Sequence, residues 1–212
     1  EMVRALGSIA GEKADRALDG LMSLTHPKAL KTVVGEIGRR ARKGAAQKLA
    51  PWARRHANLG VQAEATRLLG VLGSERHLPI LTANLGVPSY RDFLASAAVA
   101  GLAATRDPRH IPRLRKSCLP GAPFGVRLAA VRALADFSAH DPSLVPWLCG
   151  LVEDPDERVT LCVVAALGST EDERVLPLLE RLIKSASNPR VRVYAAEAAA
   201  RVKAGGKKAA LN

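Results

Sequence analysis

The chain has 212 residues, of which 48% are hydrophobic and only 3% aromatic, and its formal net charge at pH 7 is +12. Such a chain can bury a core, which excludes a largely disordered protein, and its small and aliphatic side chains favour packed helices. No apolar run approaches the roughly 18 to 20 residues of a membrane span, and no signal-peptide pattern opens the sequence, so we expect a cytoplasmic protein.

A helical pattern is already present at the first residues, and no capping residue precedes it at Glu1. A repeat array that starts inside a helix leaves an apolar face uncovered. We therefore expect the chain to be a module of a larger protein.

A basic run follows, because residues 38–62 contain seven basic residues and no acidic residue. One interpretation is a solvated helix end on which cations complement the helix dipole. The other is a surface for an acidic partner, which would be an acidic protein, an adjacent domain or nucleic-acid phosphate. The candidate residues are Arg39, Arg40, Arg42, Lys43, Lys48, Arg54 and Arg55.

One residue pair recurs at predicted helix ends with a period of about 32 residues, which is typical of stacked helical repeats. Within each repeat, one column contains small side chains that let neighbouring helices approach closely. This column predicts a packing seam and consists of Ala65, Ala98, Ala130, Val163 and Ala195. The recurring pairs are Leu6-Gly7, Ile37-Gly38, Leu69-Gly70, Leu102-Ala103, Leu134-Ala135, Leu167-Gly168 and Ala199-Ala200.

A second helix start lies after each of the middle repeat ends. Ser74, Asp107, Asp141 and Asp172 are suitable N-caps, and a proline follows five residues later at Pro79, Pro112, Pro146 and Pro177. We expect each proline to sacrifice about one backbone hydrogen bond and to bend the helix near its start.

These patterns predict an all-α protein, an α-solenoid of about six helix pairs after one partial unit. The predicted repeat domain covers residues 1–203, with units that end near residues 7, 38, 70, 103, 135, 168 and 200. Residues 204–212 are predicted to be a basic, flexible tail.

The sequence resembles the HEAT-repeat family, in particular the short PBS-lyase HEAT-like form. The resemblance rests on "RDPRHIPRLRK", "HDPSLVPWLCGLVEDPDERVTLCVVAALG" and "TEDERVLPLLERLIKSASNPRVRVYAAEAAA". The stretch "SYRDFLASAAVAGLAATRDPRHIPRL" is also similar to the HEAT-like region of bacterial zinc aminopeptidases of the aminopeptidase N type. The first resemblance implies a scaffold that binds protein partners.

In a solenoid, the second helices of the pairs form a continuous inner surface, so residues between their buried columns are candidates for partner contact. The alternative is that these arginines only bridge adjacent repeats. The candidates are Gln62, Arg67, Arg127, Arg132, Thr160 and Arg192.

Signatures of catalysis are absent from the sequence, which contains no HExxH, GxSxG, P-loop or GxGxxG motif. The histidines suit solvated or capping positions, and Cys118, Cys149 and Cys162 suit inert thiols in apolar helices. We predict no catalytic residue, cofactor or metal, and a non-catalytic protein-interaction scaffold. Two alternatives stay open, namely nucleic-acid binding through the basic run and a HEAT-like lyase or DNA glycosylase with a site assembled across repeats.

Overall fold

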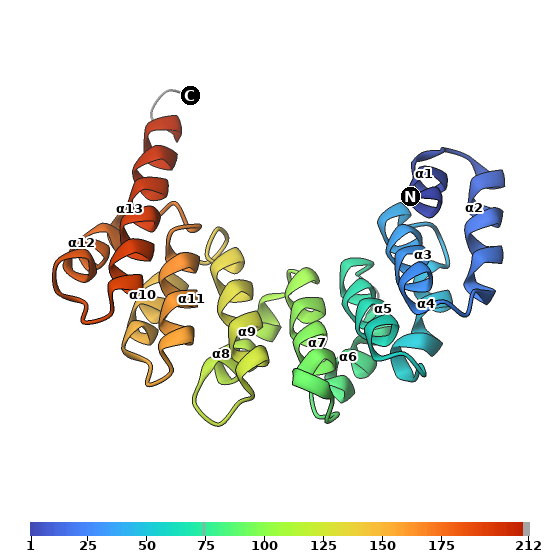
Figure 1. The fold of residues 1–212 in the computed structure, drawn as a ribbon, viewed down its shortest axis with the longest axis horizontal. Helices are drawn as coiled ribbons and strands as arrows, with labels where there is room; N and C mark the ends of the chain where they lie inside the picture. The colour runs from blue at the N-terminus through green and yellow to red at the C-terminus, as the bar shows by residue number, and fades with distance from the viewer. Residues whose placement is uncertain (74, 210–212) are drawn as a thin grey trace. The chain divides into compact units, whose positions relative to one another are not determined.

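The computed structural model describes residues 1–73 and 75–209, and within them the chain forms thirteen α-helices and no β-strand (Figure 1). The predicted all-α solenoid class is therefore confirmed. No helix in this described part is both long and apolar enough to cross a bilayer.

The helices form two compact units, Glu1–His110 and Ile111–Asn212. The first unit contains α1 (Met2–Ser8), α2 (Glu12–Gly20), α3 (Pro27–Arg40), α4 (Ala45–Arg54), α5 (Leu59–Val71), α6 (Leu78–Asn84) and α7 (Phe93–Ala104). The second contains α8 (Ile111–Cys118), α9 (Phe124–Phe137), α10 (Leu144–Cys149), α11 (Glu157–Leu167), α12 (Leu176–Ser185) and α13 (Pro189–Ala209).

Helix pairs stack within each unit. After the single helix α1, the pairs are α2–α3, α4–α5 and α6–α7 in the first unit, and α8–α9, α10–α11 and α12–α13 in the second. In the first unit α5 packs between α3 and α7, and in the second α11 packs between α9 and α13 (Figure 1). Each second helix therefore contributes two faces to the core, which a single pair has no means to bury.

Small residues hold the second helices close together. The side chains of the predicted seam, Ala65, Ala98, Ala130, Val163 and Ala195, are all fully buried, which confirms that prediction. The recurring helix-end glycines serve the same contact. A Cβ atom at Gly70 would lie only 1.9 Å from the carbonyl oxygen of Gly101, and one at Gly168 would lie 2.7 Å from the Cα atom of Ala198.

The first helix of a pair often begins with a 3-10 turn. Such turns cover η2 (Glu75–His77), η4 (Pro108–His110) and η6 (Glu173–Val175). Asp107, Asp141 and Asp172 accept hydrogen bonds from the backbone amides two residues later, at 2.9, 3.1 and 2.9 Å, so they cap as predicted. Ser74 lies outside the described residues.

The prolines of these helices cost less than predicted. Each α-helix proper begins only one or two residues before its proline, which places Pro79, Pro112, Pro146 and Pro177 within the first α-helical turn. Amides in that turn have no acceptor within the helix. The predicted loss of one backbone hydrogen bond is therefore wrong, because the sequence pattern did not separate the 3-10 turn from the helix.

At the C-terminal end, the backbone of residues 204–209 continues helix α13. The flexibility of residues 204–212 stays a prediction. Residues 210–212 lie outside the described residues.

The contact between Gly70 and Gly101 leads to a stability prediction. Substitution Gly70→Ala places a methyl group against backbone atoms, and we expect it to lower the free energy of unfolding by about 1–3 kcal/mol. The control is Gly20→Ala in the same unit, where nothing lies within 4 Å of the new Cβ atom. Equilibrium urea unfolding measures both, and equal stability of the two variants would contradict the close approach.

Candidate functional site

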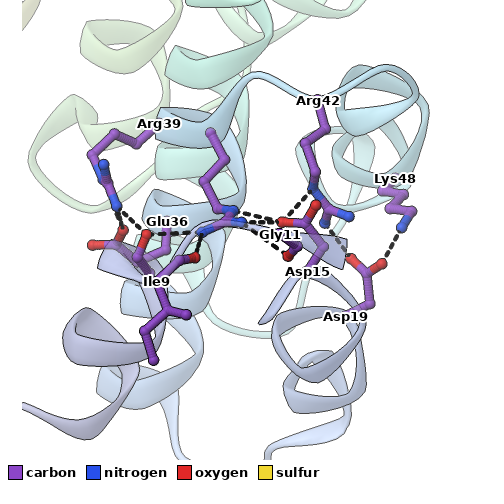
Figure 2. Close-up of polar contacts among 10 residues, drawn as sticks. Ile9, Gly11, Asp15, Asp19, Glu36, Arg39, Arg42 and Lys48 are labelled. Carbon is purple, nitrogen blue, oxygen red and sulfur yellow. Dashed lines mark hydrogen bonds and ion pairs between the residues drawn. The ribbon is translucent and has the colours of Figure 1, made fainter. Parts of the chain in front are cut away.

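Four residues of the predicted basic run are engaged with acidic residues. Arg39 pairs with Glu36 at 2.6 Å, Arg42 pairs with Asp19 at 2.9 Å, and Lys48 also pairs with Asp19 (Figure 2). Burial alone would raise the pKa of Asp19, but hydrogen bonds from Lys48 and Arg42 bring it below its usual value. The acidic partners belong to α2 and α3, so the fold neutralises much of a charge that is uninterrupted in the sequence.

Arg40 joins the N-terminal helices to α3. Its guanidinium pairs with Asp15 at 2.5 Å and donates to the carbonyl oxygens of Gly7 and Ile9 at 3.0 and 2.6 Å. Only 12% of its side chain is exposed. Arg40 therefore satisfies the carbonyl groups at the end of α1, which is a structural role rather than an open binding position.

The other cations of the run remain exposed. Lys43, Arg54 and Arg55 form no ion pair within the described part of the chain, and they lie at opposite ends of α4. Arg54 also lies near Arg76 and His77. Burial lowers the pKa of His77, and the positive charges of Arg54 and Arg76 lower it further, which indicates a positive potential at this end of α4.

Four residues of the predicted inner surface share a different role, since each donates to carbonyl oxygens at the end of the preceding helix or 3-10 turn. Such carbonyls have no donor within their own helix, so these side chains cap one helix of a pair from the other. The donors and their shortest distances are Gln62 to Arg54 at 3.2 Å, Arg127 to Cys118 at 2.8 Å, Thr160 to Val152 at 3.2 Å and Arg192 to Ala186 at 2.7 Å.

Arg127 also forms a buried ion pair with Asp154, whose side chain is 3% exposed. Asp154 lies in the turn before α11, so the pair connects two successive repeats, as the bridging alternative expected. Asp154 accepts a further hydrogen bond from the amide of Asp156 at 2.9 Å, and Asp156 caps α11. Arg127 and Thr160 are buried and are thus internal connectors of the second unit.

Arg67 and Arg132 occupy equivalent positions in different repeats but have different surroundings. Arg67 pairs with Glu64 at 2.6 Å on the same helix. Arg132 is exposed and forms no ion pair with any described residue; it lies beside the Cys162 thiol. Of the six predicted contact residues, Arg132 lines a groove in the second unit.

This groove lies wholly within the second unit, on helices α9, α11 and α13, and has a volume of about 470 Å³. Leu161 and Ala166 are buried, whereas Cys162, Ala165 and Tyr194 are half-buried. Arg132, Asp136, Arg158 and Ser169 are exposed. The groove therefore combines an apolar base of small side chains with charged and polar residues at its edge, as binding sites in proteins commonly do. Leu128 completes the lining.

The thiol in the groove is a weak nucleophile. Burial raises the pKa of Cys162, and the neighbouring Arg132 only partly offsets this effect. Burial likewise raises the pKa of Cys149, and that of Cys118 to about 12, so all three thiols are protonated near neutral pH, as predicted. Within residues 1–73 and 75–209, no three His, Cys, Asp or Glu side chains form a group that would hold a metal ion.

Sequence reasoning identified Arg132 but missed Asp136, Ser169 and Tyr194. The repeat contains a signal that identifies Asp136 and Ser169. Groove positions on α9 recur 33 residues later in the repeat of α11. Leu128 corresponds to Leu161, and Asp136 to Ser169. Arg132 corresponds to Ala165, and this exchange of a large side chain for a small one opens space beside α11. Tyr194 corresponds to Cys162 at the next repeat interval, which is 32 residues, so the same recurrence identifies it.

The buried ion pair yields a prediction. Substitution Arg127→Met leaves the Asp154 carboxylate buried without its cation, and we expect it to lower the free energy of unfolding by about 3–5 kcal/mol. The double substitution Arg127→Met, Asp154→Asn removes the isolated charge and should recover part of this loss.

The matched control is Arg67→Met, whose ion pair is partly exposed and contributes at most about 1 kcal/mol. Denaturant unfolding of the full chain measures all three variants. A loss for Arg127→Met as small as that for Arg67→Met would show that the buried pair does not stabilise the second unit.

Comparison with known proteins agrees with this architecture. A family model for HEAT repeats matches residues 118–200. A chain in the complex of CpcE and CpcF of phycocyanin lyase from Nostoc is 18% identical, with 73% of this chain and 98% of that chain covered and a TM-score of 0.57. A structure of human deoxyhypusine hydroxylase in complex with glycerol is also 18% identical, with 95% and 88% covered and a TM-score of 0.42. No curated protein matches the sequence. The chain thus shares its fold with a chain of that lyase complex, and its residues 118–200 are similar to HEAT repeats.

Proposed function

We propose that the chain is a non-catalytic protein-interaction scaffold and that the groove on α9, α11 and α13 is its contact surface. One observation supports this proposal. Arg132 and Asp136 are exposed beside a groove base of small apolar side chains, and neither forms an ion pair among the described residues. Charged residues around an apolar centre are the usual anatomy of a protein interface.

The chemistry of the groove supports binding more than catalysis. Its thiol is protonated near neutral pH, and Arg158 is engaged by Asp156 at 2.8 Å. The lyase or glycosylase alternative stays a prediction, since the groove contains one carboxylate, Asp136, and one aromatic ring, Tyr194.

Site-specific photocrosslinking in the cells that produce the protein tests the scaffold proposal. A photoreactive amino acid at Ser169, at the edge of the groove, should give discrete crosslinked products with a partner. The same amino acid at Lys184 on α12, which is exposed and outside the groove, should not. Adding Arg132→Glu should reduce the Ser169 products by about tenfold or more, because reversal of an interface charge disrupts complementarity.

Thermal unfolding of the purified Arg132→Glu variant controls for stability. Products that form equally from Lys184, or that persist with Arg132→Glu, would contradict the groove as the contact surface.

A second candidate function is nucleic-acid binding, which the positive potential around Arg54, Arg76 and His77 favours. It predicts binding to duplex DNA that weakens steeply between about 50 and 200 mM salt. The triple substitution Arg54→Glu, Arg55→Glu, Arg76→Glu should abolish the binding. The control, Lys116→Glu, Lys184→Glu, Arg190→Glu, changes the net charge equally in the second unit and should retain most of it. Fluorescence anisotropy with a labelled duplex measures both, and binding that is absent or insensitive to salt excludes this function.

A further inference from the structure

Arg132 and Asp136 carry opposite charges but do not form an ion pair with each other. They are separated by one turn of α9, and residues at this spacing have Cβ atoms about 5–6 Å apart. Opposite charges at this spacing commonly pair. Here neither side chain forms an ion pair with any described residue, and both are exposed at the groove.

The third charged residue of the groove is already occupied. The guanidinium of Arg158 lies 3.9 Å from the centre of the Phe124 ring and pairs with Asp156 at 2.8 Å. Its charge is thus neutralised locally and its side chain is held against an aromatic ring. Arg132 and Asp136 are therefore the two charges of the groove that have no ion-pair partner in the described part of the chain.

The apolar part of the groove lies beside these charges. The residues of α11 that form it are small, namely Cys162, Ala165 and Ala166, and Tyr194 of α13 lies on the other side from α9. A segment that enters the groove thus meets charged groups on the α9 side and an aromatic ring on the α13 side. It also covers Cys162.

We infer that the groove binds an extended peptide segment in which an acidic and a basic residue stand two positions apart, with an apolar residue between them. This inference rests on the proposed scaffold function and names the chemistry of the partner. In an extended chain, residues two apart point to the same side and are about 6.6 Å apart, which matches the spacing of Arg132 and Asp136.

The geometry also assigns the apolar residue. Successive side chains of an extended segment point to opposite sides. When the acidic residue faces Arg132 and the basic residue faces Asp136, the residue between them points away from α9 toward Tyr194 and the small side chains of α11.

Selection from a random peptide library displayed on phage tests this inference with the full chain as bait. Four baits are compared: the natural chain, Arg132→Glu, Asp136→Arg, and the control Arg190→Glu. Arg190 is exposed near the start of α13 and does not line the groove. All three substituted positions are exposed, and circular dichroism checks that each bait retains its helices.

The natural chain and Arg190→Glu should both enrich peptides with the acidic–apolar–basic pattern, read in either chain direction. Arg132→Glu makes both groove charges negative and should enrich peptides with two basic residues. Asp136→Arg makes both positive and should enrich peptides with two acidic residues. A peptide selected on the natural chain should bind either groove variant at least about tenfold more weakly.

Photocrosslinking locates the bound peptide. A photoreactive amino acid at Ser169, at the edge of the groove, should crosslink to the selected peptide, and the same amino acid at Lys184, outside the groove, should not. Peptides that crosslink from Ser169 but lack the charge pattern, and that bind the groove variants equally well, would overturn the inference and leave the scaffold function intact. Failure to select any peptide that crosslinks from Ser169 would overturn the inference as well, and crosslinking to a partner in cells decides the scaffold function separately.

Discussion

The close approach of successive second helices is the constraint on which the rest of the structure depends. The helix pairs are too small to bury their own apolar faces, so each unit is stable only when pairs stack. Stacking at this distance requires small residues where backbones meet, as at Gly70 against Gly101 and at Gly168 against Ala198. Larger side chains lie beside this seam of small residues. Some of them cap carbonyl groups, some form ion pairs between elements, and some line the groove.

Several ion pairs in this protein connect different elements. Arg40 and Arg42 connect α3 and the turn that follows it to α2, and Arg127 connects α9 to the turn before α11. Part of the positive charge of the basic run is therefore satisfied within the fold, whereas the net charge of +12 remains. This distinction matters for function, because a charge already satisfied within the fold contributes little to the attraction of a partner.

The fold was predictable from the sequence because repetition supplies many copies of one signal. A single Leu-Gly pair indicates little, but seven related pairs at a nearly constant interval define the helix ends, and aspartates define the helix starts. The 3-10 turns were not predictable, because the sequence pattern does not separate such a turn from the α-helix that follows it. The contact residues were predicted only in part, for a related reason. Periodicity places Arg127 and Arg132 on the same helix, but only the positions of Asp154 and Ala165 determine that the first is buried and the second faces open space.

The contacts of Arg40 have a consequence for the order in which the chain folds during synthesis. Helices α1 and α2 have 7 and 9 residues, and helices this short are marginal in isolation. Their ion-pair and carbonyl partners, Arg39, Arg40, Arg42 and Lys48, are synthesised some 30 residues later, which at about 5–20 residues per second means a delay of a few seconds. Helices α1 and α2 therefore gain these contacts only after α3 and the start of α4 have been made.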